Sequence, residues 1–97
     1  MRKPQDCANM TELRENIDAL DLQIAKLLAE RAAHIDRAAE LKPAEGLPAR
    51  IGPRVDQVVA NARRNAETLG LDADLAEQLW RTMIEWSIAR EERVLGS

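Results

Sequence analysis

The stretch MTELRENIDALDLQIAKLLAERAAHIDRAAELK, residues 10–42, decides the fold, because apolar side chains recur along it at helical spacing and no Pro or Gly interrupts it. Thr11 is in place to cap the start of this helix, and the apolar period continues to Leu41. Pro43 then predicts its end. One stripe of apolar side chains along it consists of Met10, Leu13, Ile17, Leu20, Ile24 and Leu27. We therefore expect one amphipathic helix of about thirty residues.

A second stripe of the same helix carries charges where a buried seam should be apolar. Alternating steps of three and four residues from Arg14 pass Asp21 and Arg31 and end at Lys42, so that four of nine positions are charged. Fixed cations on a seam that packs against other helices indicate a site for an anion. The alternative is that the helix turns slightly, so that the apolar stripe from Met10 to Leu27 is the one that faces the core and these charges lie at its solvated edge.

The composition is typical of one soluble domain, residues 1–97, with a helical fold. The net charge of −3, with both signs interspersed, argues against a nucleic-acid partner, and the lack of Phe and Tyr removes the usual base-stacking platform. Cys7 is the single cysteine and cannot form an internal disulfide. No apolar run is long enough for a membrane span or a signal segment. We therefore expect a cytoplasmic protein that binds no membrane.

Two shorter helices are predicted after the first. Pro and Gly cluster over residues 43–53, which predicts a loop of about ten residues, either a mobile flap or a plain connector. Gly70 lies where a left-handed C-cap belongs, and Asp72 is expected to cap the next helix. The apolar side of the second helix is Val55, Val58, Val59, Ala62, Ala66 and Leu69, and that of the third is Leu75, Leu79, Trp80, Met83, Ile84, Ile88 and Leu95. The predicted fold class is all-α, with one long and two shorter helices.

The length of the first helix predicts an obligate homodimer. About thirty residues span about 45 Å, whereas a compact domain of this size has a radius of gyration of about 13 Å. Two shorter helices cannot cover such a rod on all sides, and Arg14 cannot meet Lys42 within one chain. If two copies run antiparallel, Arg14 of one chain approaches Arg31 and Lys42 of the other, and two composite sites form by symmetry.

The chain lacks the residues that most catalytic chemistry requires. One His, one Cys and no glycine-rich phosphate loop exclude a zinc site, a Ser or Cys triad and a nucleotide cradle, so we expect no metal and no cofactor. What remains is a cationic pocket with one carboxylate. Such a pocket suits a reaction that needs only confinement and electrostatic stabilisation of a dianion.

Ser87 and Glu91 are polar residues on the apolar side of the third helix. They are four positions apart and so share a face with Trp80, Ile84 and Leu95. A glutamate donates a hydrogen bond only when protonated, and burial among apolar neighbours favours the neutral acid. The alternative is an exposed Glu91 near the C-terminus.

Several of these residues together resemble a known family, the all-helical chorismate mutases with their relative isochorismate-pyruvate lyase. The resemblance covers nearly the whole chain and continues through Gly70-Leu71-Asp72 into the third helix. It is carried by Leu13-Arg14-x-x-Ile17-Asp18-x-x-Asp21, by Leu27-Leu28-x-Glu30-Arg31 and by Lys42. The resemblance implies a dimer of two intertwined three-helix chains, in which arginines from both protomers hold the two carboxylates of the substrate.

The resemblance also implies roles for single residues. Arg14 looks like the arginine that is donated across the dimer, and Arg31 like the one that binds a carboxylate in its own site, where a planar guanidinium binds bidentately. Lys42 resembles the lysine that contacts a carboxylate and the ether oxygen, where negative charge grows as the C–O bond breaks. Arg54 matches a further family arginine, with a solvated first-turn residue of the second helix as the alternative.

Glu91 departs from the bacterial mutases, which often carry glutamine at the corresponding position. The glutamine donates a hydrogen bond to the ether oxygen, and some mutases of the family use a protonated glutamate in the same way. The resemblance therefore implies that Glu91 acts as the donor and that Ser87 is a substrate contact beside it.

The sequence separates the two family activities poorly. A valine follows Arg54, where the mutases usually carry glutamate, and the segment Lys3-Pro4-x-Asp6-Cys7 looks like the lyase branch. Ser87 and the spacing from Lys42 to Arg54 look like the mutases. We favour a chorismate mutase that converts chorismate to prephenate, and we keep isochorismate-pyruvate lyase as the second reading. A non-catalytic helical dimerisation module is the third, although a pure interface would be more stable with apolar residues at positions 14, 31 and 42.

Overall fold

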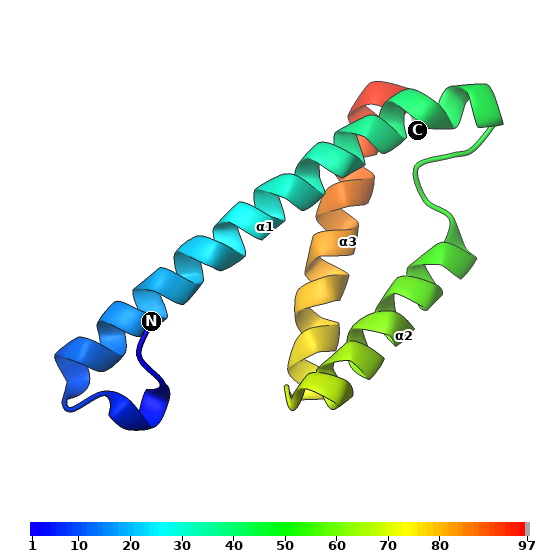
Figure 1. The fold of residues 1–97 in the computed structure, drawn as a ribbon. Helices are drawn as coiled ribbons and strands as arrows, with labels where there is room; N and C mark the ends of the chain where they lie inside the picture. The colour runs from blue at the N-terminus through cyan, green and yellow to red at the C-terminus, as the bar shows by residue number, and fades with distance from the viewer. Residues whose placement is uncertain (97) are drawn as a thin grey trace. The chain divides into compact units, whose positions relative to one another are not determined.

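The computed structural model describes residues 1–96, which form three α-helices and one short 3-10 helix (Figure 1). The elements are η1 (Pro4–Asp6), α1 (Met10–Glu45), α2 (Gly52–Leu69) and α3 (Ala73–Leu95). No strand occurs in this part of the chain, so the predicted all-α class is confirmed. The chain divides into two compact units, Met1–Ala33 and a second unit that begins at His34.

The start of α1 differs from the prediction, because the cap is Asn9 and not Thr11. Asn9 Oδ1 accepts a hydrogen bond from the Glu12 backbone N–H at 3.0 Å, and the Glu12 carboxylate accepts one from Ala8 N–H at 2.9 Å. This reciprocal pair satisfies amide donors that the first turn leaves without intrahelical partners. Thr11 therefore lies within the first turn of α1.

The end of α1 also differs, because Pro43 lies inside the helix. Proline removes one backbone donor, but only a single turn remains after it. Gly46 then adopts φ 69°, its N–H donates to Pro43 O, and Leu47 N–H donates to Lys42 O at 3.0 Å. These two bonds close the helix in a Schellman motif. Hence α1 has 36 residues, and the predicted ten-residue loop is reduced to residues 46–51.

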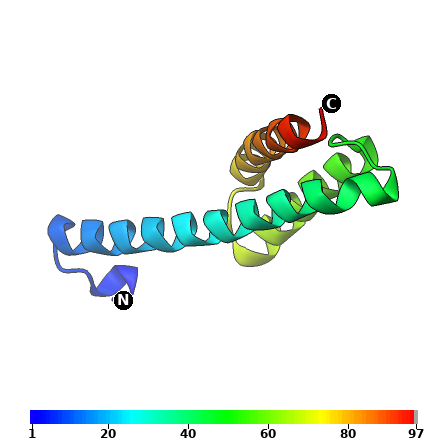
Figure 2. The same ribbon diagram turned by 90° about the horizontal axis from the view of Figure 1, so that it is seen from above.

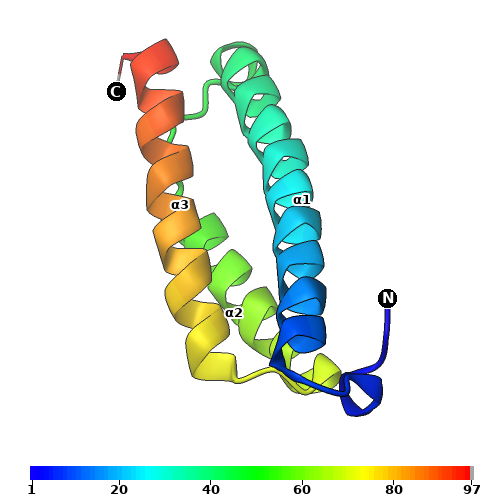
Figure 3. The ribbon, with the colours of Figure 1, turned by 90° about the vertical axis from the view of Figure 1, so that its left-hand side faces the viewer.

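The hairpin of α2 and α3 forms as predicted. Gly70 takes the left-handed conformation with φ 76°, and Leu71 N–H donates to Ala66 O at 2.8 Å. Asp72 Oδ1 accepts hydrogen bonds from Asp74 N–H at 2.8 Å and Leu75 N–H at 3.3 Å, which confirms it as the N-cap of α3. Figure 3 shows the two helices running antiparallel from this turn.

The core of the second unit is small and lies where α2, α3 and the 46–51 loop meet. Its buried members are Ala49, Val59, Ile84 and Ile88, with Val55, Val58 and Leu95 packed against them. Of the apolar side predicted for α3, Leu75 and Leu79 are instead 43% and 49% exposed. The large apolar side chains that are buried therefore lie near the loop and in the C-terminal half of α3, whereas the buried residues toward the α2–α3 turn are Ala62, Ala66 and Ala76.

The first unit carries an exposed apolar stripe. Met10, Ile17, Leu20, Ile24 and Leu27 of α1 are 46–63% exposed. The N-terminal segment packs back on the start of α1 through Asn16, whose amide donates to Arg2 O at 2.7 Å and to Cys7 Sγ. Among the described helices, none combines the length and the apolar character that crossing a bilayer requires.

Candidate active site

The buried ion pair between Lys42 and Glu91 is the centre of the candidate site. Lys42 lies in the last turns of α1 and Glu91 in the last turns of α3. Lys42 Nζ is 2.7 Å from Glu91 Oε1, and the two side chains are 16% and 6% exposed. Figure 2 shows the C-terminal end of α3 near the last turns of α1 and the loop that follows. The alternative of an exposed Glu91 is therefore wrong.

The Lys42 ammonium has a second partner, a backbone carbonyl. Lys42 Nζ donates to Ala49 O at 2.9 Å, which links the helix to the 46–51 loop. Glu91 Oε1 is fully buried and lacks a well-directed hydrogen bond, although the ammonium lies close to it. The pair is therefore held by charge attraction, and the buried carboxylate oxygen keeps unused hydrogen-bonding capacity.

Ser87 lies one turn before Glu91 and is buried, as the stripe on α3 predicted. Its hydroxyl donates to Met83 O, four residues earlier, at 2.8 Å. Such a bond to the preceding turn is the usual way for a serine to satisfy its proton inside a helix. A serine oxygen can also act as a hydrogen-bond acceptor. Ser87 and Glu91 therefore place two polar groups side by side on one apolar face.

The three predicted site arginines are located differently. Arg54 is exposed in the first turn of α2 and donates to Gln57 Oε1 at 2.7 Å, as the alternative of a solvated residue described. Arg14 is exposed and Arg31 is half-buried, and both belong to the first unit. The second unit brings Lys42 together with Glu91. The roles of all three arginines in binding substrate stay predictions.

Two ion pairs near the site could not be predicted from the sequence. Arg90 donates to both carboxylate oxygens of Asp36 and lies 5.2 Å from the centre of the Trp86 ring. The hydrogen bond from Arg90 lowers the pKa of Asp36 below its ordinary value. This pair joins α3 to α1 one to two turns before Lys42. Because its members are far apart in the sequence, no spacing rule could find it.

The second ion pair joins the loop to α3. Arg50 Nη1 and Nη2 donate to the two carboxylate oxygens of Glu85 at 3.0 Å and 2.6 Å. The hydrogen bond from Arg50 lowers the pKa of Glu85. Arg50 directly follows Ala49, whose carbonyl holds Lys42. The loop is therefore attached to α3 next to the point at which it contacts the candidate site.

The donor set of this site fits an anionic organic ligand better than a metal. Within residues 1–96, no group of three or more His, Cys, Asp or Glu side chains lies close enough to hold a metal ion. An ammonium that is largely buried has lost much of its hydration and attracts a carboxylate strongly. Chemically, the arrangement can bind an anion and stabilise negative charge that develops next to Lys42.

These features define an all-helical protein with a half-buried lysine and a buried glutamate where α1 and α3 meet. Residues 13–92 match the family model described as chorismate mutase type II, and the chain belongs to that family. The resemblance stated from the sequence is thereby confirmed.

Named relatives carry both activities that the family resemblance implied. The chain is 36% identical to the isochorismate pyruvate lyase of Pseudomonas aeruginosa over 94% of its own length and 89% of the lyase. It is 27% identical to a chorismate mutase of Methanocaldococcus jannaschii, over 89% and 87% of the two chains. It is also 34% identical to the T-protein of Enterobacter agglomerans, of which it spans 22%.

Proposed function

We propose that this chain is a chorismate mutase, which rearranges chorismate to prephenate in a pocket shared between two chains. The observation that carries the proposal is the buried Lys42–Glu91 pair, because it presents a fixed cation and a hydrogen-bonding carboxyl group at one point. In the rearrangement, the bond from the ring to the ether oxygen breaks while a carbon–carbon bond forms. No atom is gained or lost, so the site need only orient the substrate and stabilise charge.

Lys42 and Glu91 act on the ether oxygen in this proposal. The ammonium stabilises the negative charge that grows on this oxygen as the C–O bond breaks. Glu91, when protonated, donates a second hydrogen bond to the same oxygen. Ser87 lies one turn away on the same face of α3 and accepts a hydrogen bond from a polar group of the substrate.

The arginines bind the two carboxylates of the substrate. Arg31 binds one carboxylate in its own chain, Arg14 reaches in from the partner chain, and Arg54 contributes from the first turn of α2. Bidentate guanidinium–carboxylate pairs fix both the position and the orientation of a dianion. The arrangement requires a homodimer, and the exposed apolar stripe of α1 supports one, because a patch of this length is rarely left in water.

Dimerisation has a direct test in analytical ultracentrifugation. We expect one dimeric species at micromolar concentration, with unfolding that shifts to higher denaturant as protein concentration rises. A folded monomer at that concentration would contradict the shared pocket.

Isochorismate-pyruvate lyase is the second candidate function. It is favoured by the 36% identity to the Pseudomonas aeruginosa lyase over most of both chains. Its products would be salicylate and pyruvate. The same cations would stabilise the negative charge that develops as the same C–O bond breaks. The lyase and the mutase would therefore differ in their substrate more than in their catalytic residues.

One experiment separates the candidates. Purified protein is incubated with chorismate and with isochorismate in separate reactions, and prephenate, salicylate and pyruvate are quantified by chromatography. Prephenate from chorismate supports the proposal, whereas salicylate with equimolar pyruvate from isochorismate assigns the lyase. Lys42→Met should abolish either reaction, while Lys26→Met, a change at an exposed lysine of α1, should not.

If the protein converts neither substrate, the remaining candidate function is a non-catalytic helical dimerisation module. A thermal shift with a bicyclic diacid that mimics the transition state then checks for a pocket, because a ligand that binds only the folded dimer raises the melting temperature. A dimer without turnover and without a shift would contradict both catalytic readings.

A further inference from the structure

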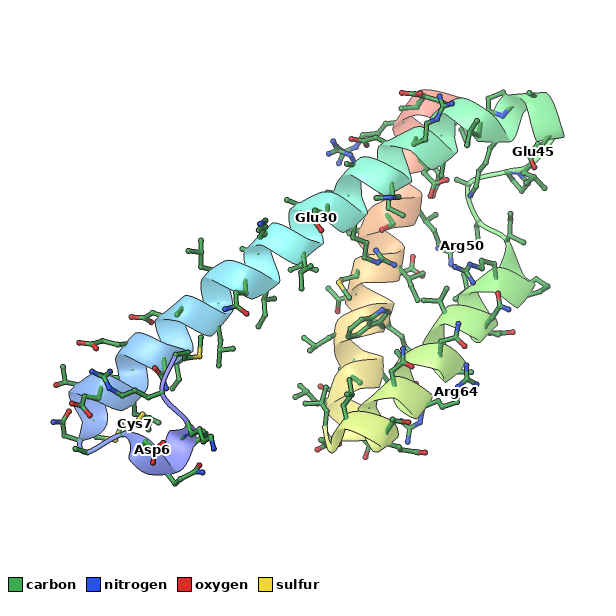
Figure 4. All side chains as sticks on the ribbon, viewed as in Figure 1. Asp6, Cys7, Glu30, Glu45, Arg50 and Arg64 are labelled. Atoms are coloured by element: carbon green, nitrogen blue, oxygen red, sulfur yellow. The ribbon has the colours of Figure 1, made fainter. Side chains whose placement is uncertain are left out.

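The loop between α1 and α2 is fixed to α3 by a bidentate ion pair at Arg50. Arg50 donates to both oxygens of Glu85, at 3.0 Å and 2.6 Å, and Figure 4 shows its side chain between the loop and α3. Two parallel bonds between a planar guanidinium and a planar carboxylate restrict orientation as well as distance. The pair therefore limits how the backbone at residue 50 can turn.

The backbone that Arg50 controls carries the hydrogen-bond acceptor of Lys42. The carbonyl of Ala49 and the nitrogen of Arg50 belong to the same planar peptide unit, so they rotate together. That carbonyl accepts from Lys42 Nζ at 2.9 Å. The Ala49 methyl is buried against Val59, Ile84 and Ile88, which fixes the position of the loop. The Arg50–Glu85 pair also restricts the direction in which the Ala49 carbonyl points.

A lysine needs such a partner, because its four-carbon side chain is flexible and its ammonium is a point charge without a preferred plane. The Ala49 carbonyl takes one of three N–H donors and leaves the others for Glu91 and for a ligand. We propose that Arg50 is a positioning residue, which acts through Glu85 and the Ala49 carbonyl to hold the Lys42 ammonium against Glu91. Its consequence for catalysis rests on the proposed function, whereas its effect on Lys42 does not.

The ion pair is poorly suited to a role in stability alone. The side chains of Arg50 and Glu85 are 53% and 60% exposed, and exposed pairs contribute little to the free energy of folding. A comparable link exists at the opposite end of the α2–α3 hairpin, where Arg63 donates to Asp74 and Glu77. Arg63 is remote from Lys42 in the hairpin and provides a matched control for loss of an ion pair between elements.

The first test measures the reactivity of the Lys42 amine. The chain has three lysines, of which Lys3 and Lys26 are exposed and serve as internal references. Each protein is treated with a short pulse of acetic anhydride, and acetylation of each lysine is quantified by mass spectrometry. Arg50→Gln and Glu85→Gln should each accelerate acetylation of Lys42 several-fold relative to the references, because the side chain then leaves its contacts with Glu91 and the Ala49 carbonyl more often and meets the reagent.

The double variant and the control decide what the acceleration means. If Arg50 and Glu85 act as one unit, the double variant should match either single variant, since the second change removes nothing more. Arg63→Gln should leave Lys42 at the wild-type rate. Unchanged Lys42 acetylation in Arg50→Gln, or an equal acceleration in Arg63→Gln, would overturn the proposal.

The second test connects positioning to turnover. With the substrate that the wild type converts, Arg50→Gln should lower kcat by about ten-fold, less than the loss that removing a reacting group causes. Arg63→Gln should retain wild-type kcat at a temperature at which every variant is folded. Faster acetylation with unchanged kcat would overturn the catalytic part. If the wild type converts neither substrate, the proposed function fails, and the acetylation result still decides the positioning of Lys42.

Discussion

Lys42 Nζ lies 2.7 Å from Glu91 Oε1, and this contact joins α1 to α3 inside the second unit. Both side chains are largely buried, so each charge depends on the other for compensation. The exposed ion pairs of the chain differ in this respect, because water screens them. Variants at this pair should therefore report on activity and on stability at the same time.

Lys42→Ala should reduce turnover and destabilise the fold. Loss of the cation removes the stabilisation of charge on the ether oxygen, which is expected to lower kcat by about a thousand-fold. It also leaves the Glu91 carboxylate buried without a counter-charge, which should cost about 3 kcal/mol in the free energy of unfolding. Steady-state kinetics and urea unfolding measure the two effects.

The stability effect has its own control. Lys42→Met combined with Glu91→Leu replaces both charges by apolar side chains of similar size, and its unfolding free energy should lie within about 1 kcal/mol of wild type. The double variant should nevertheless be inactive. A double variant as unstable as Lys42→Ala would show that the lost stability does not come from the unpaired carboxylate.

Glu91→Gln should change the pH dependence of activity. If Glu91 must be protonated in the complex to donate to the ether oxygen, wild-type kcat should be greater in mild acid and fall as pH rises. Glutamine has the same shape and donates at every pH, so the variant should give a flat profile and retain or exceed wild-type activity at neutral pH. Glu91→Ala should be poor throughout. The profiles are recorded between about pH 5 and about pH 8, where folded proteins tend to be most stable.

A wild-type profile that is already flat over this interval would remove the protonated-donor role of Glu91. In that case Glu91→Gln and wild type should also have superimposable curves. The main contribution of Glu91 would then be to orient Lys42, which the acetylation of Lys42 in Glu91→Gln can reveal.

The helices could be predicted largely from local chemistry. Gly70 and Asp72 act through backbone groups of neighbouring residues, and the structure shows them where the sequence placed them. The predicted start and end of α1 were both wrong, because more than one residue near each end could have set it. Asn9 and Thr11 are both capping residues, so the sequence offers two candidate starts, and Pro43 removes one backbone donor without ending α1 at that residue.

The site was predictable only in part. Lys42 and Glu91 were identified because each is a polar residue on an apolar helix face, and the structure brings them together. The Ala49 carbonyl could not be found in this way, since any residue can supply a backbone acceptor. Arg50 and Glu85 also lack a local signal, because their pairing depends on how the loop lies against α3.

Asp36 should make the second unit sensitive to acid. The hydrogen bond from Arg90 lowers the pKa of Asp36 from its ordinary 3.8, so the folded state binds a proton less readily than the unfolded state. The contribution of Asp36 to stability is therefore present above the ordinary aspartate range and is lost as pH falls through its lowered pKa. Asp36→Asn should lower the urea midpoint at neutral pH and reduce the further decline on acidification.

The matched control for Asp36 is Asp56→Asn, a change at an exposed aspartate of α2. Both variants remove one negative charge, so a general effect of net charge would appear in both. Equal acid sensitivity of Asp36→Asn and Asp56→Asn would contradict the role of the Arg90 pair.

The composite pocket predicts complementation between two inactive variants. Arg14→Ala removes the arginine that each chain donates to its partner, and Arg31→Ala removes the one that each chain uses in its own site. In a mixed dimer, one site then has both arginines intact and the other lacks both. Random re-association of equal amounts after reversible unfolding should place about half of the chains in mixed dimers, so about one quarter of all sites should be intact. Activity should recover to that level, whereas each variant alone should stay inactive under the same treatment.

Mixing Arg31→Ala with Lys42→Ala provides the control, because both residues serve the site of their own chain and no mixed dimer contains an intact site. Recovery in the first mixture and none in the second would support Arg14 as the residue contributed by the partner, and equal activity in the two mixtures would exclude the shared pocket.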